Sequence, residues 1–398
     1  MRAARTDLAD LHGWARLAFD ATLGVTAVVE AMHHAVRRLA PPLGPAPAGA
    51  PGGITGLVYR SIRGVTRTAG AGVELAARLA PPEPRRRSAR RQAVVAALNG
   101  VVGDHLAASG NPLALEMALC SAGEPLSLEQ AALARAFPAA PRRVLVLVHG
   151  ACQDDLRWRR RGHDHGAALA AELGVAAVYV RYNTGRHVSD NGRALAALLE
   201  RLVAAWPAPA AELSFLAHSM GGLVTRSALH AGEAAGHAWP GRARELVFLG
   251  TPHHGSPLER GGHWLDLLLG QSPYAAPIGR LGRIRSAGVT DLRHGSLVEA
   301  DWRGRDRFGR RGRRPTPVPL PAGVRAFAVA ATLARAPGLR DGLGDGLVPL
   351  ASALGDHAEP GRALGIPPGR RFIARGRGHF DLLDNPAVYA QLRAWLAR

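Results

Sequence analysis

The second half of the chain alternates short apolar runs with longer segments in which apolar residues recur at helical spacing. The runs predict strands at 144–148, 176–182, 213–217, 245–249, 324–330 and 372–374. The helical spacing predicts helices at 167–173, 191–206, 220–230 and 386–397. Continuous apolar runs are typical of strands that are buried on both faces. The alternation therefore predicts an α/β fold, with a mostly parallel sheet covered by helices on both faces.

Before about residue 140 the pattern is helical throughout. Helices are expected at 7–39, 54–79 and 92–106, separated by breaks rich in proline, glycine and arginine. We therefore expect a helical N-terminal region, residues 1–140, followed by an α/β domain, residues 141–398. A long irregular stretch is expected within that domain, from 251 to 322.

The N-terminal helix over residues 54–67 is amphipathic. Val58, Ile62 and Val65 share one face, and arginines lie off it. Such a helix can lie on a membrane surface or pack its apolar face on another part of the protein. Packing on the C-terminal domain is the interpretation we favour.

Arginine dominates the charge of the chain. There are 50 basic and 31 acidic residues, a formal charge of +19, and no lysine. Abundant Ala, Arg, Gly and Pro indicate a compositional bias, and peripheral contact with an anionic membrane is the alternative. The arginines crowded into residues 303–314 favour a solvated loop, again with docking on anionic lipid as the alternative. Nucleic-acid binding is disfavoured, because the basic runs lack interleaved aromatic residues.

Several other classes of function find no support in the sequence. Cys120 and Cys152 allow one disulfide or two free thiols, but no disulfide framework. No signal-peptide pattern and no apolar run of membrane-spanning length occurs, which favours a cytoplasmic protein with optional membrane association. His163 and His165 lack the partners of a metal site. No metal and no cofactor is therefore expected.

The strongest chemical signal is Ser219, at the junction of a predicted strand and a predicted helix. The segment 213–224 reads Leu-Ser-Phe-Leu-Ala-His-Ser-Met-Gly-Gly-Leu-Val. A serine between small residues at such a junction is typical of a nucleophile elbow, usually written Gly-x-Ser-x-Gly. Here the first glycine is Ala217, which adds only a methyl group.

A nucleophilic serine needs a base, an acid that orients the base, and donors for an oxyanion. His379, in a glycine-rich loop after the last strand, is the candidate base. Asp345, between two glycines, is the candidate acid, and Asp341 and Asp356 are the alternatives. The expected oxyanion donors are the backbone amides of Met220 and Ala151, with Cys152 as the second choice for the latter. His149 is expected to shape its loop.

Taken together, these residues resemble the α/β-hydrolase superfamily, and within it the lipase and GPI-inositol-deacylase-like serine esterases. The motifs that carry the resemblance are 147–150, 217–222, 249–256, 345–349 and 378–380, and it extends over residues 142–398. The resemblance implies Ser219 as nucleophile, His379 as base and Asp345 as acid. It also implies a cap or lid at 256–322, in which Trp264 and nearby leucines would line an acyl pocket or form the core of a cap helix.

The function predicted from the sequence is hydrolysis of a carboxylic ester, lipid-like in kind, through a Ser-His-Asp triad and an acyl-enzyme. An acyltransferase would use the same residues with an alcohol in place of water. A membrane- or protein-docking module, based on the N-terminal helices and arginine clusters, is the alternative from another class.

Overall fold

The computed structural model describes residues 8–39, 53–79, 89–208, 211–256, 286–305, 314–338 and 344–397. The chain divides into two compact units, one comprising residues 1–87 and 106–114 and the other 88–105 and 115–398. The larger unit therefore takes in segments before residue 140 that the sequence pattern groups with the N-terminal region.

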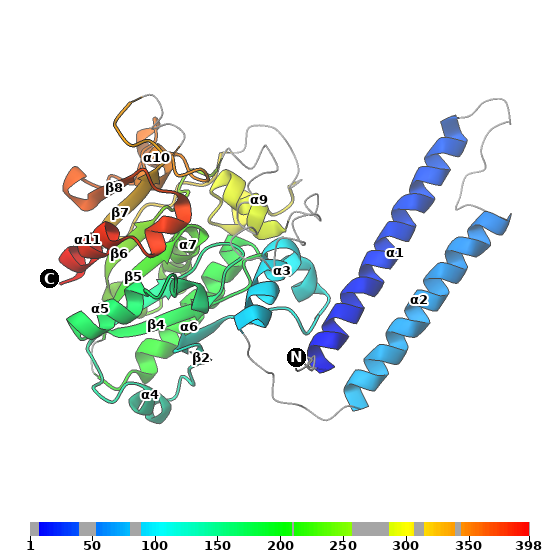
Figure 1. Cartoon of the computed structure of the whole chain (residues 1–398), viewed down its shortest axis with the longest axis horizontal. Coiled ribbons are helices and arrows are strands. Elements are labelled where there is room, and N and C mark those ends of the chain that lie inside the picture. The colour runs from blue at the N-terminus through cyan, green and yellow to red at the C-terminus, as the bar shows by residue number, and fades with distance from the viewer. Residues whose placement is uncertain are drawn as a thin grey trace. The chain divides into compact units, whose positions relative to one another are not determined.

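The smaller unit contains two long helices, α1 (Leu8–Leu39) and α2 (Gly53–Leu79), which lie side by side (Figure 1). His12 and Glu74 join them, with 2.9 Å between Nε2 and Oε2. On α2, the apolar side chains of Val58, Ile62 and Val65 are exposed.

An eight-stranded sheet forms the centre of the larger unit. Its strands are β1 (Ala118–Ser121), β2 (Glu124–Pro125), β3 (Arg143–Val148), β4 (Ala176–Arg181), β5 (Glu212–His218), β6 (Ala243–Leu249), β7 (Arg325–Thr332) and β8 (Arg371–Arg375). They lie in the order β2-β1-β4-β3-β5-β6-β7-β8. β1 runs antiparallel to β2 and β4, and all other neighbours are parallel. The six strands predicted from apolar runs are confirmed, with ends that shift by one or two residues.

Helices cover both faces of this sheet (Figure 1). α5 (His165–Leu173) packs against α11 (Pro386–Leu396), and α6 (Val188–Ala205) packs against α7 (Met220–Ala234). The central strands β3 and β5 are buried along almost their whole length, as their mainly apolar sequences require.

Several elements of the larger unit were not predicted. β1 and β2 form a hairpin whose two loop residues, Ala122 and Gly123, both have positive φ (50° and 82°), as a tight turn of this kind requires. α4 (Gln130–Ala136) follows them. The expectation of an irregular stretch at 251–322 is wrong for α9 (Ala287–His294), which has a Ser286 N-cap and a left-handed Gly295 at its end.

Hydrogen bonds join α9 to the rest of the larger unit. Ser286 Oγ donates to the carbonyl of Gly100 in α3 (Ala89–Ala108), at 2.6 Å. The amide of Ala287 donates to Asp104, and His187 pairs with Asp291 at 2.9 Å. This part of the predicted cap is thus packed on the body of the unit, and residues 257–285, with Trp264, lie outside the described residues.

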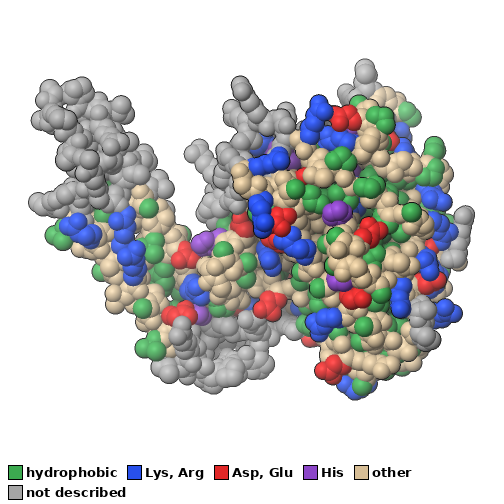
Figure 2. Space-filling view, turned by 180° about the vertical axis from the view of Figure 1, so that it is seen from behind, with side chains coloured by type: hydrophobic (Ala, Val, Ile, Leu, Met, Phe, Trp, Pro, Cys, Tyr) green, Lys and Arg blue, Asp and Glu red, His purple; other side chains and the backbone are tan. Residues whose placement is uncertain are grey.

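The basic residues are spread over the surface. In Figure 2 arginine side chains appear on several parts of the visible face, with acidic side chains between them. No helix in the described residues is both long enough and apolar enough to cross a membrane.

Candidate active site

Ser219 occupies a strained turn between β5 and α7. Its φ and ψ are 53° and −123°, a region that residues other than glycine rarely adopt. Its amide donates to the carbonyl of Leu249 at the end of β6, 2.8 Å away, which ties the turn to the neighbouring strand. The strand-to-helix turn predicted from the sequence is confirmed.

The small residues after Ser219 are required by close backbone contacts. A Cβ atom on Gly221 would clash with the carbonyl oxygen of Val148, and one on Gly222 would clash with the side chain of Thr251. Ala217, the departure from the usual pattern, is fully buried within β5. Its methyl group is therefore accommodated where glycine is more usual.

His379 and Asp345 are brought together from two different loops. The Nδ1 atom of His379 lies 2.7 Å from Oδ2 of Asp345, and both side chains are almost completely buried. The amide of His379 also donates to the carbonyl oxygen of Asp345, at 3.2 Å. The other ring nitrogen of His379, Nε2, is buried and has no hydrogen-bond partner among the described residues.

Close contacts at two glycines locate His379 and Ser219 relative to the neighbouring loops. A Cβ atom built on Gly250, directly after Leu249, would lie 3.1 Å from Nδ1 of His379. A Cβ atom built on Gly150 would lie 3.0 Å from Cβ of Ser219. The amide of Ser219 donates to Leu249, the last residue of β6, and His379 lies beside Gly250, the next residue. The serine and the imidazole therefore lie beside the same strand end.

Of the alternative acids, Asp356 pairs with Arg371, at 2.9 Å. Asp341 lies outside the described residues. Asp345 is the acid that the structure places against His379.

Two further histidines line this region, and neither has a carboxylate hydrogen-bond partner among the residues that the structure describes. His149 stacks on Tyr182, with ring centroids 4.3 Å apart, and its Nδ1 lies 2.9 Å from the carbonyl oxygen of Gly150. Burial lowers the pKa of His149 to about 4. Burial also lowers the pKa of His218 well below its usual range. Both rings are therefore neutral at pH 7, and the geometry of His149 matches the loop-shaping role expected for it.

Side-chain acceptors fix the loop after β3. The amide of Gly150 donates to the side-chain oxygen of Gln153, at 3.1 Å, and the amide of Cys152 donates to the hydroxyl of Thr184, also at 3.1 Å. Within the described part of the chain no group accepts from the amide of Ala151. Met220 is the first residue of α7, where an amide has no partner inside the helix.

Gln153 and Thr184 are positioning residues that the sequence analysis did not identify. Each is a single polar residue in a loop, and their role depends on tertiary contacts that no local pattern shows. Among the described residues no cluster of three His, Cys, Asp or Glu side chains has the arrangement of a metal site. Cys120 and Cys152 are both buried.

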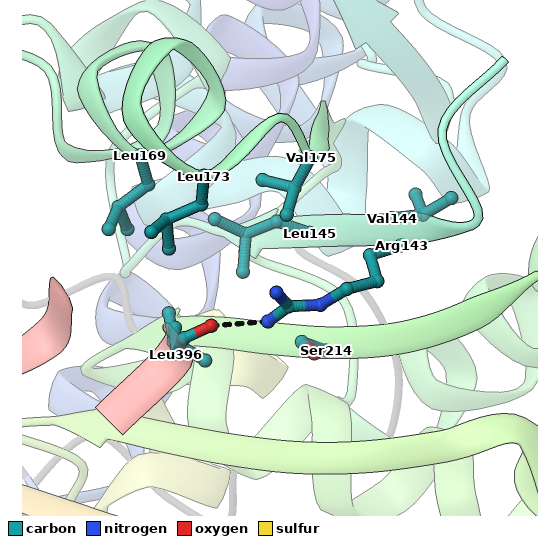
Figure 3. A pocket seen from close by; sticks show the side chains of 8 residues that line it. All are labelled: Arg143, Val144, Leu145, Leu169, Leu173, Val175, Ser214 and Leu396. Atoms are coloured by element: carbon teal, nitrogen blue, oxygen red, sulfur yellow. Dashed lines mark hydrogen bonds between the residues drawn. The ribbon is translucent and has the colours of Figure 1, made fainter. Parts of the chain in front are cut away.

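A small cavity at the opposite end of β3 is a packing defect. It has a volume of about 10 Å³ and lies among residues of β3, α5 and the end of α11 (Figure 3). Arg143 reaches across it to the carbonyl of Leu396. A space of this size holds at most one water molecule, so it offers no room for a substrate.

Three features define the architecture: the strand order of the mostly parallel sheet, the helices on both of its faces, and the strained serine turn at the carboxyl end of β5. This is an α/β-hydrolase fold. The fold class predicted from the sequence is confirmed on these grounds.

Comparisons with known proteins add the following. A model for a domain of unknown function (DUF7379) matches residues 124–275. Curated proteins gave no match. Among solved structures, the mature form of the lipase BlEst2 from Bacillus licheniformis is 19% identical with a TM-score of 0.41, over 71% of this chain and 98% of that one. A metagenomic carboxyl esterase is 17% identical with a TM-score of 0.38, over 81% and 97%. EstA from Clostridium botulinum is 14% identical with a TM-score of 0.37, over 65% and 87%.

Proposed function

We propose that this protein is a serine hydrolase that cleaves carboxylic esters, with a preference for lipid-like acyl groups. The single observation that carries the proposal is the joint placement of Ser219 on a strained turn and of a buried His379–Asp345 pair beside the same strand end. A strained turn has a folding cost, and such strain typically persists where function requires it.

In the proposed reaction, Ser219 Oγ attacks the ester carbonyl while Nε2 of His379 takes its proton. Asp345 holds the ring through Nδ1 and stabilises the imidazolium that forms. The amides of Met220 and Ala151 would bind the oxyanion of the tetrahedral intermediate. Its collapse expels the alcohol, which receives the proton from His379. Water then attacks the acyl-enzyme with His379 again as base, which releases the acid and restores Ser219.

His379 suits the role of base because its two nitrogens have different surroundings. Nδ1 faces the carboxylate, which fixes its proton there, and Nε2 is then a lone-pair acceptor with no competing donor among the described residues. Neither His149 nor His218 has a carboxylate at one ring nitrogen among the described residues, and burial disfavours the protonated form of both.

The preference for lipid-like esters follows from the resemblance of the sequence motifs to lipases. An acyltransferase would form the same acyl-enzyme, and product analysis with added alcohols separates the two reactions. A series of p-nitrophenyl esters from short to long acyl chains measures the acyl preference.

The decisive test is labelling with a fluorophosphonate probe, which reacts with activated serines. We expect the wild-type chain to be labelled and Ser219→Ala to remain unlabelled while keeping its circular dichroism spectrum. Ser189→Ala, whose hydroxyl accepts from the indole of Trp302, is the control and should label normally. Equal labelling of wild type and Ser219→Ala would refute the proposal.

A second candidate function, peripheral membrane binding, is supported by α2. Val58 is 48% exposed and Val65 71%, and the exposed arginines Arg60 and Arg67 lie nearby along the same helix. Exposed apolar residues beside cations suit an anionic lipid surface. The test is sedimentation of the full chain with phosphatidylglycerol vesicles, comparing wild type with the double variant Val58→Asp and Val65→Asp. Equal sedimentation of the two would contradict this function.

A further inference from the structure

A second cavity in the larger unit lies away from the triad residues. Its volume is about 230 Å³, and it is bounded by α7, the loop after β6 and the segments 315–320 and 361–364. Its polar lining consists chiefly of Arg226, His253, His254, Thr316 and Arg362. None of Ser219, Asp345 and His379 lines it. Its lining, as far as the structure describes it, contains four cationic or imidazole side chains and no acidic residue.

Arg226 is a buried cation without a carboxylate partner among the described residues. Only 5% of it is exposed. Its Nη2 donates to the carbonyl of Val318 at 2.6 Å, and its Nη1 lies 3.4 Å from Nδ1 of His253. Its Nε has no hydrogen-bond partner in the described part of the chain. Burial lowers its pKa to about 10, so that it still carries its charge at pH 7. A buried charge without a counter-ion is strongly unfavourable, which points to an anionic occupant.

His253 adds a second unused donor. A guanidinium can only donate, so Nδ1 of His253 must accept from Arg226, and the ring proton is then on Nε2. Nε2 is buried and has no acceptor among the described residues. Unsatisfied buried donors are rare, and two on the wall of one cavity, Nε of Arg226 and Nε2 of His253, indicate a missing acceptor.

The neighbouring carboxylates that the structure describes do not supply that acceptor. Asp301 accepts hydrogen bonds from the amides of Leu297 and Thr316, at 3.0 and 2.8 Å. It also accepts from the Thr316 hydroxyl, at 2.8 Å. Glu359 lies 3.6 Å from Arg314. These carboxylates are already engaged elsewhere.

We propose that this cavity binds a phosphate group, either as the free anion or as the headgroup of a small phosphate ester. Guanidinium and imidazole N–H groups are the donors that proteins use for phosphate oxygens, and a tetrahedral oxyanion accepts from several directions at once. Arg226 and Arg362 would neutralise its charge, and Nε2 of His253 would donate to a third oxygen. The apolar part of the wall, from Leu297, Leu320 and Leu364, leaves room for a short organic substituent.

An occupant would also brace the fold locally. Arg226 already holds the segment 315–320 through Val318, and His253 belongs to the loop that follows β6. A ligand that binds only the folded state raises the apparent stability by mass action. Phosphate should therefore raise the unfolding temperature of the full chain, and the rise should depend on Arg226.

The test is isothermal calorimetry and thermal unfolding of the full chain with three probes at equal ionic strength: inorganic phosphate, glycerol 3-phosphate and chloride. The variant is Arg226→Gln. The control is Arg244→Gln, because Arg244 is an exposed arginine that pairs with Glu212 outside the cavity. We expect phosphate or glycerol 3-phosphate to bind wild type and the control, with a dissociation constant at least about tenfold larger in Arg226→Gln, equivalent to about 1.4 kcal/mol.

The two phosphate probes separate the two sources of the group. Tighter binding of inorganic phosphate assigns the site to the free anion, and tighter binding of glycerol 3-phosphate assigns it to an ester. Should Arg226→Gln fail to fold, Arg362→Gln, at a less buried position of the same wall, is measured instead and should weaken binding several-fold. Equal effects of chloride and of both phosphate probes, or undiminished binding in the folded cavity variant, would overturn the proposal.

Discussion

The Nδ1 atom of His379 lies 2.7 Å from Oδ2 of Asp345, while Oδ1 of that carboxylate accepts from the amides of Leu347 and Val348 at 2.9 and 2.8 Å. The backbone thus fixes the carboxylate independently of the histidine. One oxygen is used to hold the acid in its loop, and the other orients the imidazole. Because Nδ1 of His379 faces the carboxylate, Nε2 is the nitrogen of the ring that can accept a proton.

Replacing Asp345 by Asn tests that relationship. An amide keeps the size of the side chain, but its NH₂ group can favour the wrong tautomer of His379, in which Nε2 carries the proton. We expect ester turnover to fall by about 10⁴-fold while the unfolding temperature changes little, by analogy with the same change in other Ser-His-Asp sites. The measurement is kcat on a p-nitrophenyl ester, with the circular dichroism spectrum as a check on folding.

Asp356→Asn is the matched control for this prediction. Asp356 is a carboxylate of the same unit that pairs with Arg371 at 2.9 Å. Its substitution should leave turnover within a few-fold of wild type. If Asp356→Asn lost as much activity as Asp345→Asn, the acid would have been assigned to the wrong residue.

Gly150 offers a steric test of the placement of Ser219. A Cβ atom there would lie 3.0 Å from both Cβ of Ser219 and Nδ1 of His218, which is closer than ordinary contact. Gly150→Ala should displace the serine or the oxyanion loop, and displacements near 1 Å cost about 10²-fold in rate. Gly241→Ala, where a Cβ atom meets nothing within 4 Å, is the control and should keep full activity. Equal rates for the two variants would argue against Gly150 as a neighbour of the reacting serine.

The parts of the fold that could be predicted from the sequence are those whose signal is local. β3 and β5 are mainly apolar runs, because both of their faces are buried, and Ser219 follows β5 directly. His379 and Asp345 were predicted from their positions after late strands. Parallel strands direct such loops to one edge of the sheet.

The parts that were missed depend on contacts between distant residues. β1 has only four residues and is stabilised by pairing with β4, and its turn uses Ala122 where Asn or Asp would have signalled a hairpin. α9 is short and is anchored by Gly100 and Asp104 of a distant helix. Arg226 carries no signal of its own in the sequence, and His253 stands out there only within the motif 249–256. The significance of both for the cavity depends on which side chains surround them in the folded chain.

The two cysteines should be unreactive in the native protein. Both are buried, and burial raises the pKa of Cys152 to about 12. Because the thiolate is the reactive form, we expect a thiol reagent such as DTNB to label neither residue at pH 8, and to label both after denaturation in guanidinium. Incubation of the native protein with DTNB should leave ester turnover unchanged. Rapid labelling of the native chain at Cys152 would show that the loop after β3 opens in solution.

Buried neutral histidines should make the protein sensitive to acid. Burial lowers the pKa of His149, His165 and His254 to about 4, whereas an unfolded histidine titrates near 6.5. Between these values the unfolded state binds more protons, so the free energy of unfolding rises with pH and is lost as pH falls. Asp154 acts in the opposite sense, because burial raises its pKa to about 6, but it is a single group.

His165 isolates one contribution to this acid sensitivity. It is fully buried, and its Nε2 lies 2.9 Å from the carbonyl oxygen of Leu382. A single histidine with this shift accounts for about 2 kcal/mol of the stability lost between pH 7 and pH 5. The glutamine of His165→Gln can still donate to Leu382, but it does not titrate. The free energy of unfolding in urea is therefore measured at pH 7 and at pH 5, and in the variant the difference between the two values should shrink by up to about 2 kcal/mol. His230→Gln, at an exposed position of α7, should leave the difference as in wild type. An unchanged difference in His165→Gln would mean that this imidazole becomes protonated in the folded chain as readily as in the unfolded one.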